Sequence, residues 1–329
     1  MASPPTMASA PTNTYTQQLA SGTVHEDVSD VIYRIDPEET PFVSALPQVG
    51  SKQILTEWLV QTLNSAADVP QPEGFTAVIS PSVKPVRMSN VCQIFARTVG
   101  VSGTLRVVDS IGGEDEYNRH LVMRGIELKR DLELVATSNI PKAATDPRHM
   151  AGFPTFCTNG STGSGTGAMP AGDGTTAAVA GTARDLTLDI VNQAMQAAWT
   201  AGGSPTIGLM SGNIKNYFST LSQGGTSNAI VAQNIVSTSP QAQMTIQGAV
   251  DVYRTNFGTL QLAPDRFMPP NMILLVSRDY VELAPLPERN MIEQPYAKTG
   301  DNTQGGIIFE GTIRVTAPKA HAAIFGLNQ

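Results

Sequence analysis

The longest regular pattern in the sequence lies between residues 114 and 137, and it limits the possible folds more than any other feature. Acidic residues open the segment, where the helix dipole favours negative charge, and Pro141 follows its end. Apolar residues recur at steps of three and four, at Tyr117, Leu121, Gly125, Leu128, Leu132 and Val135. This spacing is typical of one face of an α-helix. At ~1.5 Å per residue the helix would be roughly 35 Å long, so the fold must supply an equally long surface to cover it.

Two strand-like segments precede this helix and together suggest a long hairpin. Residues 52–63 and 90–101 are rich in β-branched, aromatic and other apolar residues, and a proline-rich stretch separates them. Such composition favours strands, but an isolated two-stranded hairpin is marginally stable in water. We therefore expect a neighbouring copy of the chain to cover its apolar side chains, among them Trp58, Leu59 and Phe95.

The beginning of the chain has the composition of an arm. Residues 1–30 are dominated by Pro, Ser, Thr and Ala, and such a segment cannot bury enough apolar surface to offset its ordering entropy. Tyr15 and Leu19 are spaced apolar anchors within it. We expect the arm to become ordered only where a neighbouring chain supplies contacts. A dispensable tail is the alternative that the sequence leaves open.

Residues 158–183 consist of Gly, Ser, Thr and Ala with almost no large apolar residue. This composition predicts a flexible surface loop. The run Gly163-Ser-Gly165-Thr-Gly167 is not a phosphate-binding loop, because the spacing and the lysine of that motif are missing.

The second half of the chain alternates between helical and strand-like patterns, which predicts a compact α/β unit over residues 185–287. Helices are expected at 187–201 and 213–221, and strands at 206–210, 249–257, 259–262 and 272–276. Beyond this unit, residues 307–315 alternate between apolar and polar side chains, and residues 322–327 form an apolar run. We expect these last two segments to form a closing hairpin that packs under the long helix.

Composition and charge argue against several classes of function. The chain has 329 residues, of which 41% are hydrophobic, and this is enough for real cores. No apolar run reaches the roughly 18 residues of a membrane span, and the first residues lack the pattern of a secretory signal. The net charge is −7 and no basic cluster is present, so we expect weak, non-specific contact with DNA at most.

No pattern of catalytic, cofactor-binding or metal-binding residues stands out. The four histidines are scattered, and Cys92 and Cys157 are too few for a disulfide framework or a Cys-rich zinc site. Metalloprotease, EF-hand and nucleophile-elbow patterns are missing. No enzyme class therefore gains support from the sequence, and we expect no catalytic site, no cofactor and no metal.

Short motifs run in a fixed order from about residue 28 to the end of the chain. They are Asp30-Val-Ile-Tyr33, Thr40-Pro41-Phe42, Glu57-Trp58, Ala151-Gly152-Phe153, Val250-Asp-Val-Tyr253, Asn256-Phe257-Gly258, Arg266-Phe-Met-Pro269, Ala297-Lys-Thr-Gly-Asp301, Glu310-Gly-Thr312 and Lys319-Ala-His321. With these motifs, and with its order of arm, hairpin, long helix, α/β unit and closing hairpin, the sequence resembles the major capsid proteins of tailed bacteriophages. The resemblance is to their podovirus-like and siphovirus-like subfamily.

The resemblance implies an α+β fold of the Hong Kong ninety-seven type and a division of the chain into named parts. These parts are an N-terminal arm over 1–50, an E-loop β-hairpin over 51–103, the first part of a peripheral domain over 104–184 with a spine helix at 114–137, an axial domain over 185–287, and the return of the peripheral domain over 288–329.

The resemblance also implies a function. Members of this family self-assemble into pentamers and hexamers that form the icosahedral head around double-stranded DNA. We would then expect the protein in the virion after synthesis in the cytoplasm of a bacterial host, with the portal, a decoration protein and a separate scaffolding protein as possible partners and no membrane. Encapsulin compartments share this fold and are the main alternative, and another virion structural protein is a further one.

The sequence suggests nine residues as contacts between subunits. Two interpretations stay open for the arginines on the long helix: they pair with charges of a neighbouring subunit, or they lie on an ordinary solvent-exposed helix face. The candidates are Tyr15, Leu19, Trp58, Leu59, Phe95, Arg119, Arg124, Lys298 and Asp301.

Deletion of residues 1–25 tests the role of the arm. The shortened chain should fold and form capsomers, but its shells should break at a lower temperature, because the arm would tie subunits together only after they meet. Light scattering during heating measures this difference. Equal hydrogen-exchange rates for residues 13–25 in free subunits and in shells would show that the arm is only a tail.

Overall fold

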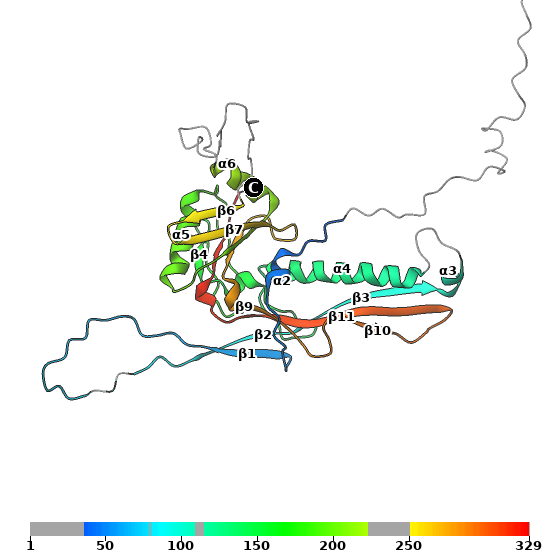
Figure 1. Cartoon of the computed structure of the whole chain (residues 1–329), viewed down its shortest axis with the longest axis horizontal. Coiled ribbons are helices and arrows are strands. Elements are labelled where there is room, and N and C mark those ends of the chain that lie inside the picture. Colours follow the sequence, from blue (N-terminus) through cyan, green and yellow to red (C-terminus); the bar gives the residue numbers. More distant parts are fainter. Residues whose placement is uncertain (1–35, 78, 80, 109–114, 223–250, 329) are drawn as a thin grey trace, which may run out of the picture.

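A long helix on a long sheet forms the axis of the molecule. The computed structural model describes residues 36–77, 79, 81–108, 115–222 and 251–328. Helix α4 (Glu116–Thr137) lies along a four-stranded antiparallel sheet, in which β11 is central and pairs with β3, β9 and β10 (Figure 1). The strands of this sheet are β3 (Gln93–Ser102), β9 (Val281–Pro285), β10 (Ile292–Pro295) and β11 (Asn302–Val315).

Helix α4 follows the predicted stripe and begins two residues later than expected. Asp115 caps its start, since its carboxylate accepts a hydrogen bond from the backbone N–H of Tyr117. Leu128 and Leu132 are fully buried on its inner face. Arg97 of β3 donates two hydrogen bonds of 2.7 Å to Asp131 of α4, which fixes the helix to the sheet. A short helix, α3 (Gly103–Val107), follows β3.

A second unit is built on a six-stranded mixed sheet in the order β4-β12-β8-β5-β7-β6. Its strands are β4 (Asn159–Ser161), β5 (Ile207–Met210), β6 (Val252–Thr255), β7 (Gly258–Pro264), β8 (Ile273–Val276) and β12 (Ala322–Ile324). Helices α5 (Leu188–Thr200) and α6 (Gly212–Ser222) pack on one face, against Ile273 and Leu275 of β8. Leu274 and Val276 face the other way, into the main core. All four residues of β8 are buried, as the continuous apolar run predicts.

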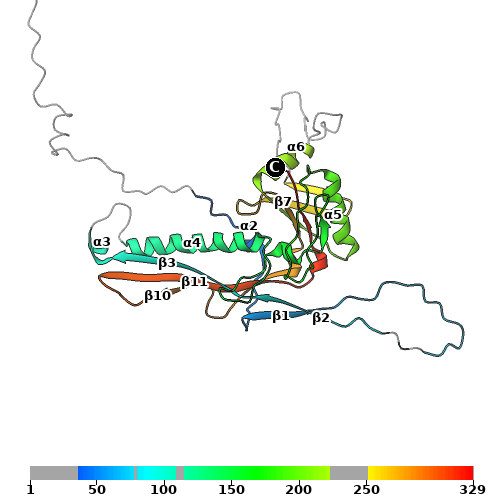
Figure 2. The same ribbon diagram turned by 180° about the vertical axis from the view of Figure 1, so that it is seen from behind.

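A two-stranded arm leaves the body where these two units meet. Strand β1 (Leu55–Val60) pairs antiparallel with β2 (Val86–Val91), and the described residues between the two strands form a long loop. Figures 1 and 2 show this arm pointing away from the end of the body that α4 and β3 reach. Only Cys92 separates β2 from β3, so the arm continues directly into the four-stranded sheet.

Four short helical segments connect these parts. They are α2 (Pro41–Ala45), η1 (Phe153–Phe156), η2 (Arg278–Tyr280) and η3 (Pro318–Ala320).

The predicted partner of the first hairpin strand is wrong for most of its length. Residues 52–63 pair with 90–101 only at Leu55–Val91 and Thr56–Asn90. The rest of β1 pairs with residues 86–89 of β2, and β3 pairs with β11 over ten residue pairs. The alternating pattern in residues 90–101 identified a strand correctly but carried no information about its partner. Phe95 of β3 lies opposite Phe309 of β11, with ring centroids 6.0 Å apart, and this contact helps to fix the register.

The predicted closing hairpin is also wrong. Residues 307–315 belong to β11 and the four-stranded sheet, whereas β12 lies between β4 and β8 in the six-stranded sheet. The helical turn η3 redirects the chain from one sheet to the other. The two apolar segments are therefore adjacent in sequence but belong to different sheets.

The prediction of a flexible surface loop at 158–183 does not match the structure, in which this segment is folded against the body. Strand β4 pairs with β12, and isolated bridges join Ser164 to Thr182 and Ala168 to Val179. The small residues permit this close packing. A Cβ atom at Gly174 would lie 2.7 Å from the ring of Phe156. The many small residues of this segment therefore allow it to lie close to the body.

A buried carboxylate on α4 holds the beginning of the described chain in place. Thr40 makes no side-chain cap for α2, and both oxygens of Glu133 instead accept hydrogen bonds of 2.7 Å, one each from the N–H groups of Phe42 and Val43. Glu133 is fully buried, and burial raises its pKa to about 7. The nearby Asp265 is also buried, and burial raises its pKa too.

Glu133 should make the stability of the subunit depend on pH. The pKa of Glu133 is higher in the folded chain than in the unfolded chain, so its contribution is present below pH ~4.5 and is lost as pH rises through ~7. Glu133→Gln should remove a slope of up to ~1.4 kcal/mol per pH unit from the free energy of unfolding in this range. Denaturant titrations at several pH values measure the slope. Glu127→Gln, on the partly exposed side of the same helix, is the control, and an unchanged slope in Glu133→Gln would contradict the prediction.

Candidate assembly surface

The base of the arm is fixed to the body by one buried amide. The side chain of Asn90 is fully buried, and its Nδ2 donates hydrogen bonds to the backbone oxygens of Ala151 and Ile313, at 3.3 and 2.9 Å. Its Oδ1 accepts hydrogen bonds of 2.9 Å from the N–H groups of Val91 and Ala151. All four hydrogen-bonding positions of the amide are used, so the arm has one orientation at its root.

The aromatic residues expected to await a neighbouring subunit are buried within their own chain. Trp58 is 9% exposed, and its ring centroid lies 6.1 Å from that of Phe156. Phe95 is 7% exposed and packs against Phe309. The expectation that their own chain leaves them uncovered is therefore wrong. Successive side chains of β1 point to opposite faces of the strand, however, and Leu59 next to Trp58 is 67% exposed.

The loop of the arm exposes apolar side chains that nothing in the described chain covers. Leu63 and Ile79 are 94% and 95% exposed, and Val69 and Phe75 are also exposed. Two side-chain amides link the two legs of the loop, from Gln61 to the oxygen of Val83 and from Asn64 to that of Pro81. A four-residue turn over residues 72–75 reverses the chain at the tip. Its third residue, Gly74, has a φ of 77°, a backbone conformation that glycine adopts readily.

A groove of about 710 Å³ lies between the arm and the body. One wall is the arm itself, at residues 60–63 and 83–88. The opposite wall consists mainly of small residues after η1, after α5 and around η3. They include Ala171, Gly172, Ala201, Gly202, Ala317 and Ala320. Side chains this small leave room for a larger side chain from elsewhere.

The other predicted contact residues do not form one cluster. Arg119 and Arg124 make ion pairs with Glu116 and Glu127 of the same helix, which is the arrangement of an ordinary helix surface. Lys298 and Asp301 are exposed in the turn between β10 and β11. Tyr15 and Leu19 lie outside the described residues.

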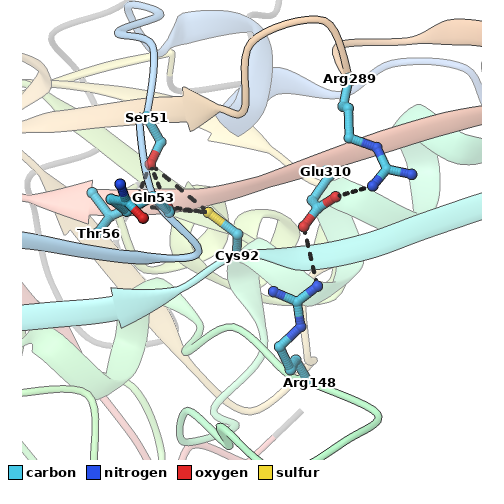
Figure 3. Close-up of polar contacts among 7 residues, drawn as sticks. All are labelled: Ser51, Gln53, Thr56, Cys92, Arg148, Arg289 and Glu310. Atoms are coloured by element: carbon cyan, nitrogen blue, oxygen red, sulfur yellow. Dashed lines mark hydrogen bonds and ion pairs between the residues drawn. The ribbon is translucent and has the colours of Figure 1, made fainter.

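The buried polar groups near the arm hold segments together. Figure 3 shows Glu310 of β11 between two arginines, with 3.1 Å to Arg148 and 2.8 Å to Arg289. The same view shows Cys92 beside Ser51, Gln53 and Thr56. Burial raises the pKa of the Cys92 thiol, which therefore stays neutral and is a poor nucleophile.

Burial also keeps His321 and Cys157 neutral near neutral pH. His321 is fully buried, its Nδ1 accepts a hydrogen bond from the N–H of Ser277, and burial lowers its pKa to about 3. Burial raises the pKa of Cys157 as well. Within the described residues, no group of three or more potential ligands could hold a metal ion, and no helix is long and apolar enough to cross a membrane.

Sequence reasoning missed the features that define this surface. Asn90 was treated as part of a strand, although a polar residue beside apolar Val91 in a strand was a signal that it needs buried partners. The ion pairs of Glu310 join residues from different parts of the chain, and the groove is lined by stretches that range from residue 60 to residue 320. No local pattern could indicate either one.

Comparison with protein families places the chain in one of them. The model of the SU10 major capsid protein family matches residues 10–328, nearly the whole chain. The chain belongs to this family. A curated major capsid protein of Escherichia phage Phieco32 is 33% identical to this SU10-family chain over 113 residues, which are 34% of this chain and 32% of that protein. The chain thus aligns with about a third of that relative's length.

Solved structures show that this family member has the fold of capsid proteins. The capsid asymmetric unit of cyanophage A-1(L) superimposes with a TM-score of 0.65 at 14% identity, over 94% of this chain and 98% of that one. The encapsulin of the holo-SrpI complex from Synechococcus elongatus PCC 7942 has a TM-score of 0.56 at 10% identity, over 97% of both chains. The predicted α+β fold of the Hong Kong ninety-seven type is confirmed, and so is the predicted family.

Two neighbouring residues of β1 should respond differently to truncation. Trp58→Ala should lower the free energy of unfolding of the subunit by about 3–5 kcal/mol, because it removes a buried aromatic side chain. Leu59→Ala should change it by no more than about 0.5 kcal/mol, because Leu59 is exposed. Denaturant unfolding of the free subunits measures both, and similar losses for the two variants would show that β1 has another orientation.

Proposed function

We propose that this protein is the major capsid protein of a tailed bacteriophage and that copies of it assemble into pentamers and hexamers of an icosahedral head. The observation that carries the proposal is the arm, which is anchored rigidly at Asn90 and ends in a loop whose apolar side chains the described chain leaves exposed. Exposed apolar surface of this kind marks a contact with another molecule. Membership of the SU10 major capsid protein family makes that molecule a further copy of the chain.

The role we propose is structural and not enzymatic. The buried titratable residues hold segments of the chain together, as Glu133 does for α2 and Glu310 does for β11. Neutral Cys92 and His321 are unsuited to act as a nucleophile and as a proton carrier near neutral pH. Stability and association are the properties that these arrangements serve.

The partners we propose besides the chain itself are the packaged DNA and other virion proteins. A chain of net charge −7 would meet double-stranded DNA through few phosphate contacts, and these would be sensitive to salt. A separate scaffolding protein, the portal and a decoration protein would act during or after assembly. The protein would be made in the cytoplasm of the bacterial host and would end in the virion.

An encapsulin-like compartment remains the second candidate because the encapsulin fold superimposes over nearly the whole chain. The family match favours a phage head instead. The contents of particles isolated from the natural source separate these two functions. Nuclease-protected double-stranded DNA supports a head, and an enclosed enzyme without DNA supports a compartment.

Removal of the exposed apolar side chains from the arm loop tests the proposed assembly. The variant Leu63→Ser/Ile79→Ser should keep the thermal unfolding temperature of the wild-type subunit, because both side chains are almost fully exposed. Its assembled fraction should fall at least tenfold in sedimentation experiments. Val179→Ser, at an exposed position of the body, controls for the loss of an apolar side chain. A wild-type chain that stays monomeric under every ionic condition, alone and with phage proteins, would refute the proposed function.

A further inference from the structure

Two buried carboxyl groups meet between α4 and the loop that follows β7. Glu133 lies on α4, and Asp265 is the first residue after β7. Both side chains are fully buried, and their carboxyl groups are in hydrogen-bonding contact. Two ionised carboxylates have no hydrogen to place between them, and their like charges repel. The contact therefore needs a proton.

The other hydrogen bonds of the two groups indicate which oxygen carries this proton. Both oxygens of Glu133 already accept hydrogen bonds from backbone N–H groups of α2. Oδ1 of Asp265 accepts a hydrogen bond of 2.9 Å from the N–H of Phe267, and the N–H of Met268 also faces this carboxyl group. Oδ2 of Asp265 is buried and accepts no hydrogen bond within the described part of the chain. This oxygen is free to hold the proton and to donate it to Glu133.

The surroundings supply no positive charge to replace the proton. The short elements α2 and η1 and the strands β5 and β8 contain no titratable side chain. His321 packs against η1 and is neutral, because burial lowers its pKa to about 3. The other charged side chains near the joint are exposed or have other contacts: Glu38, Glu39, Lys129 and Arg266 are exposed, Arg130 lies on the ring of Phe267, and Asp131 pairs with Arg97.

The joint connects three parts of the chain. Glu133 belongs to the helix that covers the four-stranded sheet and binds the N–H groups of α2. Asp265 belongs to the other unit, since its own N–H donates a hydrogen bond of 2.9 Å to the oxygen of Met210 at the end of β5. Two of the short sequence motifs, Thr40-Pro41-Phe42 and Arg266-Phe-Met-Pro269, thus meet at one place on α4.

We propose that Glu133 and Asp265 share one proton and form a proton-dependent latch, which holds α2 and the loop after β7 on α4. While the proton is bound, Asp265 donates to Glu133, and Glu133 accepts from both N–H groups of α2. When the proton leaves to water, two negative charges remain in contact in the interior, and one of them has to move into solvent. The contacts of α2 and of the loop with α4 then loosen. The latch lies within one chain, so it does not depend on the proposed assembly.

Hydrogen exchange of α2 in the full-length chain tests the latch. Burial raises the pKa of Glu133 to about 7, so the latch should be closed at about pH 6 and open at about pH 8.5. The protection of the N–H groups of Phe42 and Val43, relative to an unstructured peptide at the same pH, should fall at least tenfold between these two values. Glu127→Gln, on the partly exposed side of the same helix, should behave as the wild type does.

Two variants separate a shared proton from ordinary packing. In Asp265→Asn, the amide nitrogen donates to Glu133 at every pH, and the amide oxygen can still accept from Phe267. The protection of α2 should therefore stay high at both pH values. In Glu133→Gln, a single amide oxygen faces two N–H groups, so protection should be low at both pH values. If the pair served packing alone, both variants would lose protection.

Infrared spectra count the proton directly. At about pH 6 the wild type should show the absorption of one more protonated carboxyl group than Asp265→Asn, and this difference should disappear as the pH rises through ~7.

Three results would overturn the inference. They are equal α2 protection of the wild type at the two pH values, which needs no variant, loss of α2 protection in a folded Asp265→Asn chain, and identical infrared spectra of the wild type and Asp265→Asn. None of them would touch the proposed function, which depends on whether the wild type assembles.

Discussion

The side-chain amide of Asn90 is the contact on which the geometry of this protein depends. It lies at the end of the arm strand β2 and binds two other parts of the chain, the segment before η1 and the strand β11. A buried amide without these partners would be costly, because each unpaired polar group in the core loses its hydrogen bonds to water. The amide therefore penalises other orientations of the arm, and this is what turns a marginal two-stranded hairpin into a rigid extension of the body.

Elements with a strong local pattern could be predicted from the sequence, but the strand with which each strand pairs could not. Helix α4 was predictable because its apolar stripe and acidic start persist over 22 residues, and buried β8 was predictable from four apolar residues in a row. The pairing of β3 with β11 joins residues about 200 positions apart, and alternation alone cannot specify such a partner. Composition also misled at residues 158–183, since small residues are equally typical of flexible loops and of tight packing.

The residues of the candidate assembly surface also fall into those that the sequence could predict and those that it could not. Leu59, predicted as a contact between subunits, is exposed on the arm, whereas Trp58 beside it packs on Phe156. Periodicity of two gives the two faces of a strand but does not say which face meets the body. The structural roles of Glu133 and Glu310 were not predicted, because each contacts groups from other parts of the chain, α2 for one and two arginines for the other. Both replace apolar packing by directional contacts, which favour one arrangement of the joined segments over its competitors.

The continuity of β2 and β3 has a mechanical consequence. Only Cys92 separates the two strands, and β3 is joined to β11 by a ladder of ten residue pairs. A pull on the arm is transmitted through the backbone into β3 along the strand direction. The hydrogen bonds of the ladder are then loaded in shear, so they share the force and must yield together, whereas a force across the strands would open them one after another. A layer of such molecules under tension from within would be limited by the strength of that ladder and not by the flexibility of the arm.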